Sequence, residues 1–243
     1  MNAHSSGPIG VTRLLVHGAN GRMGQALLRL AGTRGDLQVV AAVARTVGQR
    51  VIDGVPQYAA TELHAAPEFD VAIDFSLPDG FSSVLALCIE RGSGLVSGTT
   101  GLDDRQKTAI SAAGRSIPVV WASNFSLGVA VLASLVERAA RALPGWDCDV
   151  IEAHHSRKVD APSGTALTLG DIAAAQGAQP RYESIRAGDI VGEHTVQFTS
   201  DGERIELVHR ATNRDIFARG ALHAAARLVG RPAGVYGLSD LID

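Results

Sequence analysis

Residues 14–24, LLVHGANGRMG, decide the fold of the first half of the chain. The apolar run at 14–16 is typical of a short buried strand; it leads into glycines spaced GxxGxxG and then into a helix with apolar residues at 23, 27, 30 and 31 on one face. Strand, glycine turn and helix in this order let a pyrophosphate approach the backbone at a helix N-terminus. Because the spacing differs from the usual GxGxxG, a tight turn without a ligand stays as the alternative. The candidate cofactor residues here are Gly18, Ala19, Asn20, Gly21, Arg22 and Met23.

The end of the second predicted strand, residues 37–43, indicates which dinucleotide is bound. A dinucleotide-binding fold often places an acidic residue about 20 residues after the glycines, where it binds the ribose 2′-hydroxyl. This chain has Ala44 and then Arg45. A guanidinium without the acid suits a 2′-phosphate, which it binds through charge-assisted hydrogen bonds. We therefore expect NADPH to be preferred over NADH, with an ordinary surface arginine as the alternative.

Strands and helices continue to alternate up to residue 125. Strands are predicted at 71–75, 95–97 and 119–121, with helices at 78–91 and 104–113. Repeated strand–helix units predict an α/β, Rossmann-like, doubly wound parallel sheet that binds its ligand at the carboxyl ends of the strands. Two polar segments fall at those ends and are further candidates for cofactor binding: Gly98, Thr99 and Thr100, and Ser123, Asn124 and Phe125.

The second half predicts a smaller α+β domain with a mixed open sheet. A helix at 127–143 ends before Pro144-Gly145, a strand follows at 149–152, and segments 191–198 and 204–209 form a hairpin. A last helix, 215–229, is expected to return to the nucleotide domain. We therefore expect a dinucleotide-binding domain of residues 1–125 and 215–243, and a substrate-binding and tetramerisation domain of residues 126–214. His194 and His209 are interpreted as structural residues on its strands.

A cationic segment at 152–165, EAHHSRKVDAPSGT, joins the predicted strand to a predicted helix at 166–176. Its two imidazoles, guanidinium and ammonium lie at a strand end, and Ser163 caps the next helix. Such a cluster facing a helix N-terminus suits a small anion with several carboxylates. A solvated surface run of charge is the alternative.

Bulk composition excludes several classes of function. At 243 residues with 46% hydrophobic content, the chain is long enough for two cores, and a net charge of −3 without a basic face argues against nucleic acid. Cys88 and Cys148 form no CxxC pair, and no histidine cluster has metal-ligand spacing, so neither a disulfide nor a metal is expected. Residues 1–11 resemble a disordered leader, no run is long enough to span a membrane, and we expect a cytoplasmic protein.

Several motifs together resemble those of one family. GANGRMG at 18–24 and EAHHSRKVDAPSGTA at 152–166 are similar to segments of the dihydrodipicolinate reductases, also called 4-hydroxy-tetrahydrodipicolinate reductases. SGTTG at 97–101, SNFSLGV at 123–129 and RAGDIVGEHTVQF at 186–198 match in the same order. The resemblance covers nearly all of the chain after the leader.

The resemblance implies a homotetramer that reduces a small cyclic dicarboxylate with NAD(P)H in lysine and diaminopimelate biosynthesis. It implies that His154 is the acid–base residue and Lys158 the proton donor. It also implies the substrate-binding residues His155, Ser163, Gly164 and Thr165. The cofactor segments are those already identified from the strand ends.

Two features depart from the family pattern. The acidic residue that many members carry before the cofactor arginine is Ala44, and the segment before Arg186 is shorter and lacks an RxGxxGxR-like loop. Two other functions stay open: another two-domain NAD(P)-dependent dehydrogenase, acting on amino acids or sugars, and a non-catalytic NADP-sensing protein. The cationic segment favours the reductase, because a sensor needs no such cluster beside an anion site.

Overall fold

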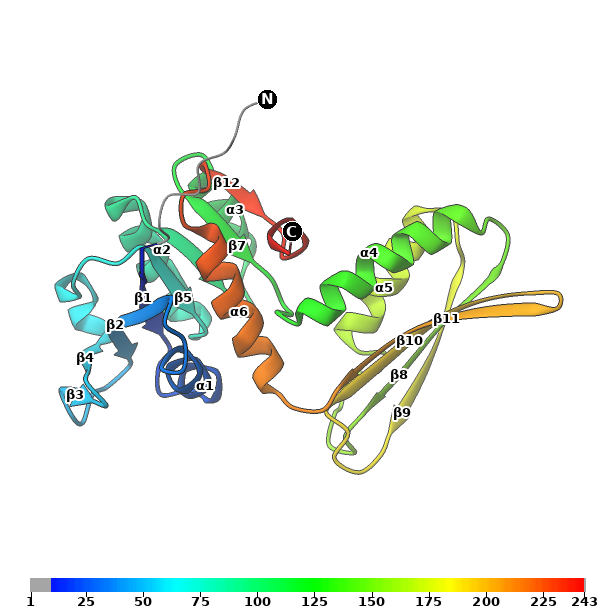
Figure 1. Cartoon of the computed structure of the whole chain (residues 1–243), viewed down its shortest axis with the longest axis horizontal. Coiled ribbons are helices and arrows are strands. Elements are labelled where there is room, and N and C mark those ends of the chain that lie inside the picture. The colour runs from blue at the N-terminus through cyan, green and yellow to red at the C-terminus, as the bar shows by residue number, and fades with distance from the viewer. Residues whose placement is uncertain (1–9, 243) are drawn as a thin grey trace. The chain divides into compact units, whose positions relative to one another are not determined.

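The computed structural model describes residues 10–242, which form two compact units (Figure 1). Unit 1 contains the chain up to Phe125 and again from Phe217, and unit 2 contains Ser126–Ile216. The chain passes from one unit to the other after Phe125 and after Ile216. Most of the expected leader, residues 1–9, lies outside the described residues.

Unit 1 is built on a sheet whose strand order is β12-β7-β6-β5-β1-β2-β4-β3. All neighbouring pairs are parallel except β3 with β4. The order reverses direction between β1 and β5, which makes this the switch point of a doubly wound fold. The strands are β1 (Thr12–His17), β2 (Leu37–Ala44), β3 (Val51–Ile52), β4 (Val55–Ala59), β5 (Val71–Asp74), β6 (Gly94–Ser97), β7 (Pro118–Trp121) and β12 (Gly234–Tyr236).

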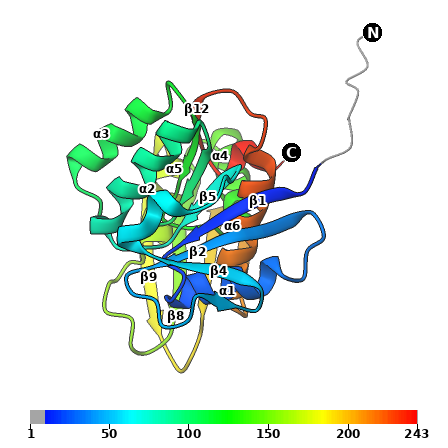
Figure 2. The ribbon, with the colours of Figure 1, turned by 90° about the vertical axis from the view of Figure 1, so that its left-hand side faces the viewer.

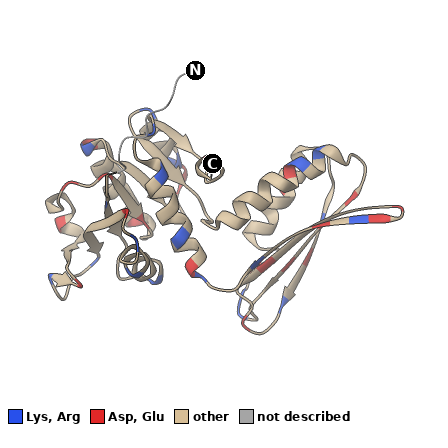
Figure 3. Cartoon of the chain, in the orientation of Figure 1, with Lys and Arg blue, Asp and Glu red and all other residues tan. Residues whose placement is uncertain are grey.

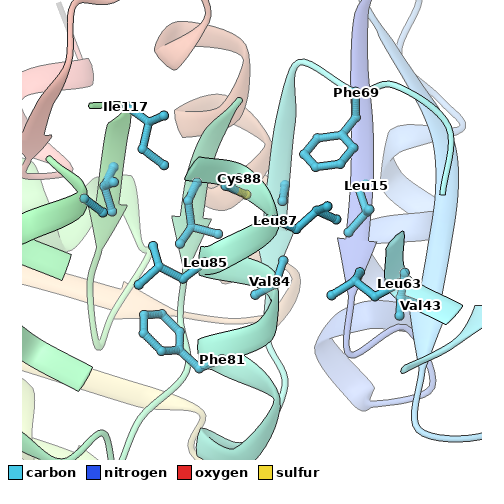
Figure 4. Close-up of a cluster of buried hydrophobic side chains, with 14 of the residues drawn as sticks. Leu15, Val43, Leu63, Phe69, Phe81, Val84, Leu85, Leu87, Cys88 and Ile117 are labelled. Atoms are coloured by element: carbon cyan, nitrogen blue, oxygen red, sulfur yellow. The ribbon is translucent and has the colours of Figure 1, made fainter. Parts of the chain in front are cut away.

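Helices cover both faces of this sheet (Figures 1 and 2). On one face, α2 and α3 enclose a core to which alternate strand residues such as Leu15, Val43 and Leu95 contribute. Leu15 and Val43 are among the side chains labelled in Figure 4. On the other face, Leu228 of α6 packs against Gly94, the neighbour of Leu95. The helices are α1 (Arg22–Ala31), α2 (Pro78–Arg91), α3 (Asp104–Ala113) and α6 (Asp215–Leu228), with short 3-10 turns at Ala60–Ala65 and Ser239–Leu241.

The predicted α/β class is confirmed, but three short strands at or next to the edges of the sheet are not predicted from the sequence. The two-residue β3 is exposed, β4 contains Pro56, and β12 has only three residues near the end of the chain. None of them offers the apolar run or the alternation that predicts a strand. They widen the sheet without changing its carboxyl edge between β1 and β5.

Unit 2 is a four-stranded sheet, order β11-β10-β8-β9, with both of its helices on one face. β10 runs antiparallel to β8 and β11, while β8 and β9 are parallel. The core lies between the helices and the inward residues of the sheet, including Val150, Val196 and Phe198. The elements are α4 (Leu127–Ala142), β8 (Asp147–His154), α5 (Gly164–Ala175), β9 (Pro180–Arg186), β10 (Gly192–Ser200) and β11 (Glu203–Ala211).

The mixed open sheet and the β10–β11 hairpin agree with the sequence analysis, whereas β9 is missed. β9 reads PRYESIR, which has three charged residues and two hydroxyl residues and no clear apolar alternation. Tertiary pairing, not local propensity, makes it a strand, because it returns from α5 to lie parallel to β8. β8 also extends two residues beyond its predicted end, and therefore includes His154.

Candidate functional site

A cleft of about 820 Å³ lies at the switch point of unit 1. Its walls come from the loop after β1, which holds Gly18 and Gly21, and from the loop after β5, which holds Phe75 and Ser76. Open α/β sheets bind their ligands in this place, because the connections that follow the two strands run to opposite faces of the sheet and leave a crevice between them. The cleft is therefore the candidate cofactor site.

Two of the three glycines in the first turn are required by its geometry. Gly18 has φ +82°, and a Cβ there would lie 2.5 Å from the Phe75 carbonyl oxygen. A Cβ at Gly24 would lie 2.3 Å from the Gly18 carbonyl oxygen, so this glycine lets α1 pack against the end of β1. No side chain caps α1 at Gly21, which leaves its first N–H groups for an anion.

The end of β2 contributes the wall expected to contact the adenosine ribose. Ala44 and Arg45 both line the cleft; Ala44 is buried and Arg45 is exposed. Asn20 donates a hydrogen bond from Nδ2 to the Thr46 carbonyl oxygen at 3.2 Å, which ties the glycine loop to this segment. Of the other residues expected in the loop, Arg22 is exposed, Met23 is half-buried and Ala19 is fully buried. Ala19 can therefore act only through its backbone.

The two further segments expected to bind the cofactor follow β6 and β7. Thr99 is 2% exposed and donates from Oγ1 to Asp74 at 2.7 Å, so its hydroxyl serves the protein interior. Phe125 is buried and packs edge-on against Phe75, with ring centroids 5.6 Å apart. Gly98, Thr100, Ser123 and Asn124 lie on the same edge of the sheet but not among the residues that line the cleft.

A buried polar network beneath the cleft is not predicted by the sequence analysis. His17 Nδ1 donates to Asp74 at 2.9 Å, while Ser97 and Thr99 donate to the second carboxylate oxygen at 2.8 and 2.7 Å. Burial alone would raise the pKa of Asp74, but the hydrogen bonds and charge from His17, with those from Ser76 and Thr99, lower it below its usual value. His17 also lines the cleft, so this network supports the floor of the candidate cofactor site.

The residues of unit 1 fit a dinucleotide. The glycine turn brings backbone N–H groups to the mouth of a helix, the cleft is long enough to reach Arg45, and its apolar wall includes Leu63 and Phe75. Donors for phosphate and an apolar wall for a base are the two features that such a ligand requires. Gly18, Gly21, Asn20 and Arg45 would hold it.

The candidate substrate site of unit 2 lies where the apolar face of β8 becomes polar. Cys148 and Val150 point into the core beneath the helices, and the next residues with the same orientation are Glu152 and His154. In the register of the sheet, Glu152 lies opposite His194 on β10 and beside Ser184 on β9. The alternation of β8 is therefore a sequence signal that could have identified Glu152.

Glu152 is the centre of this site, with only 1% of its surface exposed. Oε2 accepts from His154 Nδ1 at 2.5 Å and from Arg186 Nη1 at 2.8 Å. Oε1 accepts from Arg186 Nη2 at 2.6 Å, from Ser184 Oγ at 2.8 Å and from the Ser163 N–H at 3.2 Å. Burial opposes ionisation, but the hydrogen bonds from Arg186, Ser184 and His154 outweigh it and lower the pKa of Glu152 to about 2. Glu152 is thus a buried anion held by five donors.

The expected cationic residues gather on the loop after β8. His155 Nε2 lies 3.2 Å from a guanidinium nitrogen of Arg214, and burial and then the neighbouring positive charges lower the pKa of His155. Lys158 Nζ is within 2.8 Å of both carboxylate oxygens of Asp160. Arg214 is a further cation that the sequence analysis does not predict.

The expected anion cradle at the start of α5 divides into two parts. Ser163 is 2% exposed, and its hydroxyl accepts from the Ala166 N–H at 3.2 Å and lies 3.1 Å from His194 Nε2. Its side chain is therefore a helix cap, as predicted, but is buried away from a ligand. Gly164 is exposed with open space where a Cβ would stand, so the helix start at Gly164 and Thr165 is the accessible part of the cradle.

The two strand histidines have the structural surroundings predicted for them. His194 is 4% exposed, packs edge-on against His154 with ring centroids 5.2 Å apart, and has its pKa lowered to about 4 by burial and then by the proximity of His154. His209 lies 3.3 Å from the hydroxyl of Ser126, which caps α4, and burial lowers its pKa too. Both imidazoles are therefore neutral near pH 7.

Other classes of site find no support in residues 10–242. These residues contain no cluster of three or more metal-binding side chains, and none of their helices is long and apolar enough to cross a membrane. Acidic and basic residues are interspersed in both units in the view of Figure 3.

Comparisons with known proteins agree with this division. Models of the dihydrodipicolinate reductase N-terminus and C-terminus match residues 12–125 and 128–242. The chain is 69% identical to a 4-hydroxy-tetrahydrodipicolinate reductase of Xanthomonas axonopodis pv. citri (strain 306), over 95% of this chain and 97% of that protein. It is 66% identical to the protein of the same name from Xylella fastidiosa (strain 9a5c), over 95% and 98%.

Solved structures extend the comparison to the fold. A dipicolinate-bound dihydrodipicolinate reductase from Paenisporosarcina sp. TG-14 matches with a TM-score of 0.84 at 22% identity, over 96% of this chain and all of that one. A myo-inositol dehydrogenase from Corynebacterium glutamicum matches with a TM-score of 0.61 at 13% identity, over 92% and 90%. These likenesses show a fold that reductases share with dehydrogenases of other substrates.

A dinucleotide-type cleft in one unit and a cationic histidine site in the other define a two-domain, NAD(P)H-dependent oxidoreductase. The family models cover nearly all of the described residues, and the curated relative is 69% identical over 95% of the chain. The chain belongs to the dihydrodipicolinate reductase family.

Proposed function

We propose that the chain reduces 4-hydroxy-tetrahydrodipicolinate, by way of dihydrodipicolinate, to tetrahydrodipicolinate in lysine and diaminopimelate biosynthesis. The observation that supports this most directly is the site of unit 2, where His154, held by Glu152, lies near a cationic loop and an open helix start. Such a site suits a small ring with two carboxylates, which is the chemistry of this substrate. Family membership supports the same reaction.

The reaction adds one hydride and one proton across a carbon–carbon double bond. Loss of water from the hydroxylated substrate gives a double bond conjugated to the ring imine, and the reduced dinucleotide supplies hydride to one end of it when bound. The electron pair that is displaced to the other end of the double bond takes up a proton. We assign the acid–base role to His154 and proton donation to Lys158, whose ammonium exchanges its contact with Asp160 for the substrate.

The substrate carboxylates are assigned to the rest of the site. His155 and the N–H groups of Gly164 and Thr165 hold them, with the dipole of α5 adding favourable charge. Because Ser163 Oγ and N–H are both hydrogen-bonded within the protein, Ser163 acts by holding the start of α5 in place. Orientation of the ring by these fixed donors lowers the entropic part of the barrier.

For the cofactor, we propose a preference for NADPH over NADH. Ala44 provides no carboxylate at the end of β2, and Arg45 lies on the cleft wall beside it. A carboxylate in that position would bind a 2′-hydroxyl and repel a 2′-phosphate, whereas a guanidinium attracts the phosphate. The remaining proposed contacts are the glycine turn at Gly18–Met23, the segment Gly98–Thr100 and the segment Ser123–Phe125.

We also propose that the protein is a homotetramer that works in the cytoplasm. The face of the unit 2 sheet opposite to α4 and α5 exposes Ile185 by 50% and Val208 by 41%. Exposed apolar residues on an open sheet favour association with another copy. Light scattering after gel filtration measures the mass: about four chains in solution is the expected result, and a monomer would contradict it.

One assay separates the candidate functions. The loss of NADPH absorbance is followed with the condensation product of pyruvate and aspartate semialdehyde, which forms the hydroxylated substrate. The expected result is rapid oxidation of NADPH with this product, and no rise in NADPH absorbance when NADP⁺ is supplied with meso-diaminopimelate or myo-inositol. Turnover of the latter substrates would favour an amino-acid or sugar dehydrogenase, and NADPH binding without any turnover would favour a sensor.

A further inference from the structure

Five N–H and O–H groups converge on one buried carboxylate in unit 2. Oε1 of Glu152 accepts from three donors, and Oε2 accepts from two, one of which is His154 Nδ1. Arg186 contacts both oxygens and also donates to the Asp160 carbonyl oxygen at 2.7 Å, which connects β9 to the loop that carries Lys158. The position of the carboxylate is therefore fixed from several elements of the unit.

This arrangement determines which nitrogen of the His154 imidazole carries a hydrogen. An ionised carboxylate can only accept, so Nδ1 must carry a proton in both the neutral and the charged ring. The exchangeable proton is then the one on Nε2. A Cβ at Gly192 would lie 3.0 Å from this atom, and the absence of a side chain there leaves room beside it.

We propose that Glu152 is a positioning residue for His154: it holds the Nδ1–H tautomer and the ring orientation, so that Nε2 is the atom through which His154 acts as an acid or base. The proposal rests on the acid–base role of His154 in the proposed function. The carboxylate also offsets the positive charge that the imidazole carries when it is protonated. Glu152 itself is buried and does not contact the substrate.

The other ionisable groups around the ring do not take this role. His194, from β10, packs edge-on against His154 and is neutral. His155 and Lys158 are on the loop and are paired with Arg214 and Asp160, and Arg186 from β9 contacts the carboxylate. Only Glu152 accepts from Nδ1 among the contacts of the described chain.

Glu152→Gln tests the proposal with a change of one atom. The amide NH₂ must take the place of one oxygen, and Oε1 faces three donors whereas Oε2 faces two. The NH₂ group is therefore expected at the Oε2 position, where it donates to His154 Nδ1 and forces the proton onto Nε2. Ser184→Ala is the matched control, because it removes one donor from Oε1 and leaves the contact with His154 in place.

Two readouts are measured on the full-length protein. The ¹⁵N spectrum of the imidazoles, assigned by comparison with His154→Gln, is expected to show Nδ1–H for His154 in the wild type and in Ser184→Ala, and Nε2–H in Glu152→Gln. Turnover in Glu152→Gln is expected to fall by roughly 10²-fold or more, with the Michaelis constant and NADPH affinity little changed. Ser184→Ala, which keeps the contact between Glu152 and His154, is expected to lose much less turnover than Glu152→Gln.

Several results would overturn the proposal. An Nε2–H tautomer in the wild type does so without any variant, even if Glu152→Gln does not fold. A Glu152→Gln protein that binds NADPH and keeps near-normal turnover does so as well. If instead the wild type reduces none of the substrates tested, the proposed function fails, and the tautomer still decides whether Glu152 positions the ring.

Discussion

Each unit contains one buried carboxylate bonded to a histidine, yet the two pairs have different partners. In unit 1, Asp74 is hydrogen-bonded to His17 and to neutral donors at the ends of neighbouring strands, and the side chain of His17 is 5% exposed. In unit 2, Glu152 is bonded to the guanidinium of Arg186 as well, and the side chain of His154 is 12% exposed. The first pair stabilises the floor of the unit 1 cleft, whereas the second holds the partly exposed imidazole that we propose as the acid–base group.

The candidate cofactor site and the candidate substrate site are built from different kinds of groups. The candidate cofactor site uses backbone N–H groups and close approaches that glycine permits, so its polar side chains serve the interior. The candidate substrate site uses charged side chains, and it therefore needs a buried anion to hold them. Changes to the two pairs should consequently affect different properties of the enzyme.

The largest expected effect is a loss of turnover when His154, or Lys158 on the neighbouring loop, is replaced. His154→Gln and Lys158→Ala should each lower turnover by roughly 10²–10⁴-fold, because each removes one proton-transfer group. NADPH binding should persist, since the cleft lies in unit 1. Steady-state kinetics and calorimetry measure both properties, with His64→Gln as the control because His64 is an exposed histidine of unit 1. Near-normal turnover in both variants would contradict the assignment.

The second expected effect is the loss of stability in acid. The pKa of Glu152 falls from 4.5 to about 2 on folding, so between these values the unfolded state binds more protons and stability rises with pH. The contribution is on the order of 3 kcal/mol at neutral pH, and it is lost as the pH falls from about 5 to 2. Asp74 acts in the same direction in unit 1.

Two tryptophans allow the pairs to be measured separately. Trp121→Phe leaves Trp146 to report on unit 2, and Trp146→Phe leaves Trp121 to report on unit 1. In urea titrations between pH 3 and 7, Glu152→Gln should flatten the pH dependence seen by Trp146 and leave that seen by Trp121 unchanged. Asp74→Asn should do the reverse. If stability depends on pH in the same way in a variant and its parent, the carboxylate has the same pKa in the folded and unfolded states.

The same contrast explains what could be predicted from the sequence. The strand, glycine turn and helix at residues 14–31 are local, and so were the cationic loop and the Ser163 cap. The clamp on Glu152 is not local, because Ser184 and Arg186 are 32 and 34 residues away. Those residues belong to β9, a polar strand that forms only through its pairing with β8. The alternation of β8 places Glu152 on the inward face of the sheet, but its partners on β9 cannot be predicted from the local sequence.

The third expected effect is on cofactor choice. Arg45→Ala should weaken NADPH binding by roughly ten- to a hundredfold, because a hydrogen bond to a charged group contributes about 1.5–3 kcal/mol. NADH binding should be nearly unchanged, since NADH has no 2′-phosphate. Titration calorimetry with both cofactors measures the difference, and Arg50→Ala, which removes an exposed arginine paired with Glu62, is the control. Equal losses for the two cofactors would show that Arg45 does not bind the phosphate.

The smallest effects distinguish the buried and accessible parts of the cradle at the start of α5. Thr165→Val should raise the Michaelis constant for the dicarboxylate by roughly two- to tenfold, the size of one neutral hydrogen bond, with turnover almost unchanged.

Ser163→Ala should instead lower the free energy of unfolding by about 1 kcal/mol through loss of the helix cap, because its hydroxyl contacts Ala166 and His194 and is buried. Kinetics and urea unfolding of both variants measure the two quantities. A raised Michaelis constant in Ser163→Ala at unchanged stability would mean that the hydroxyl turns toward the substrate. An unchanged constant in Thr165→Val would place the carboxylates on His155 and the backbone N–H groups alone.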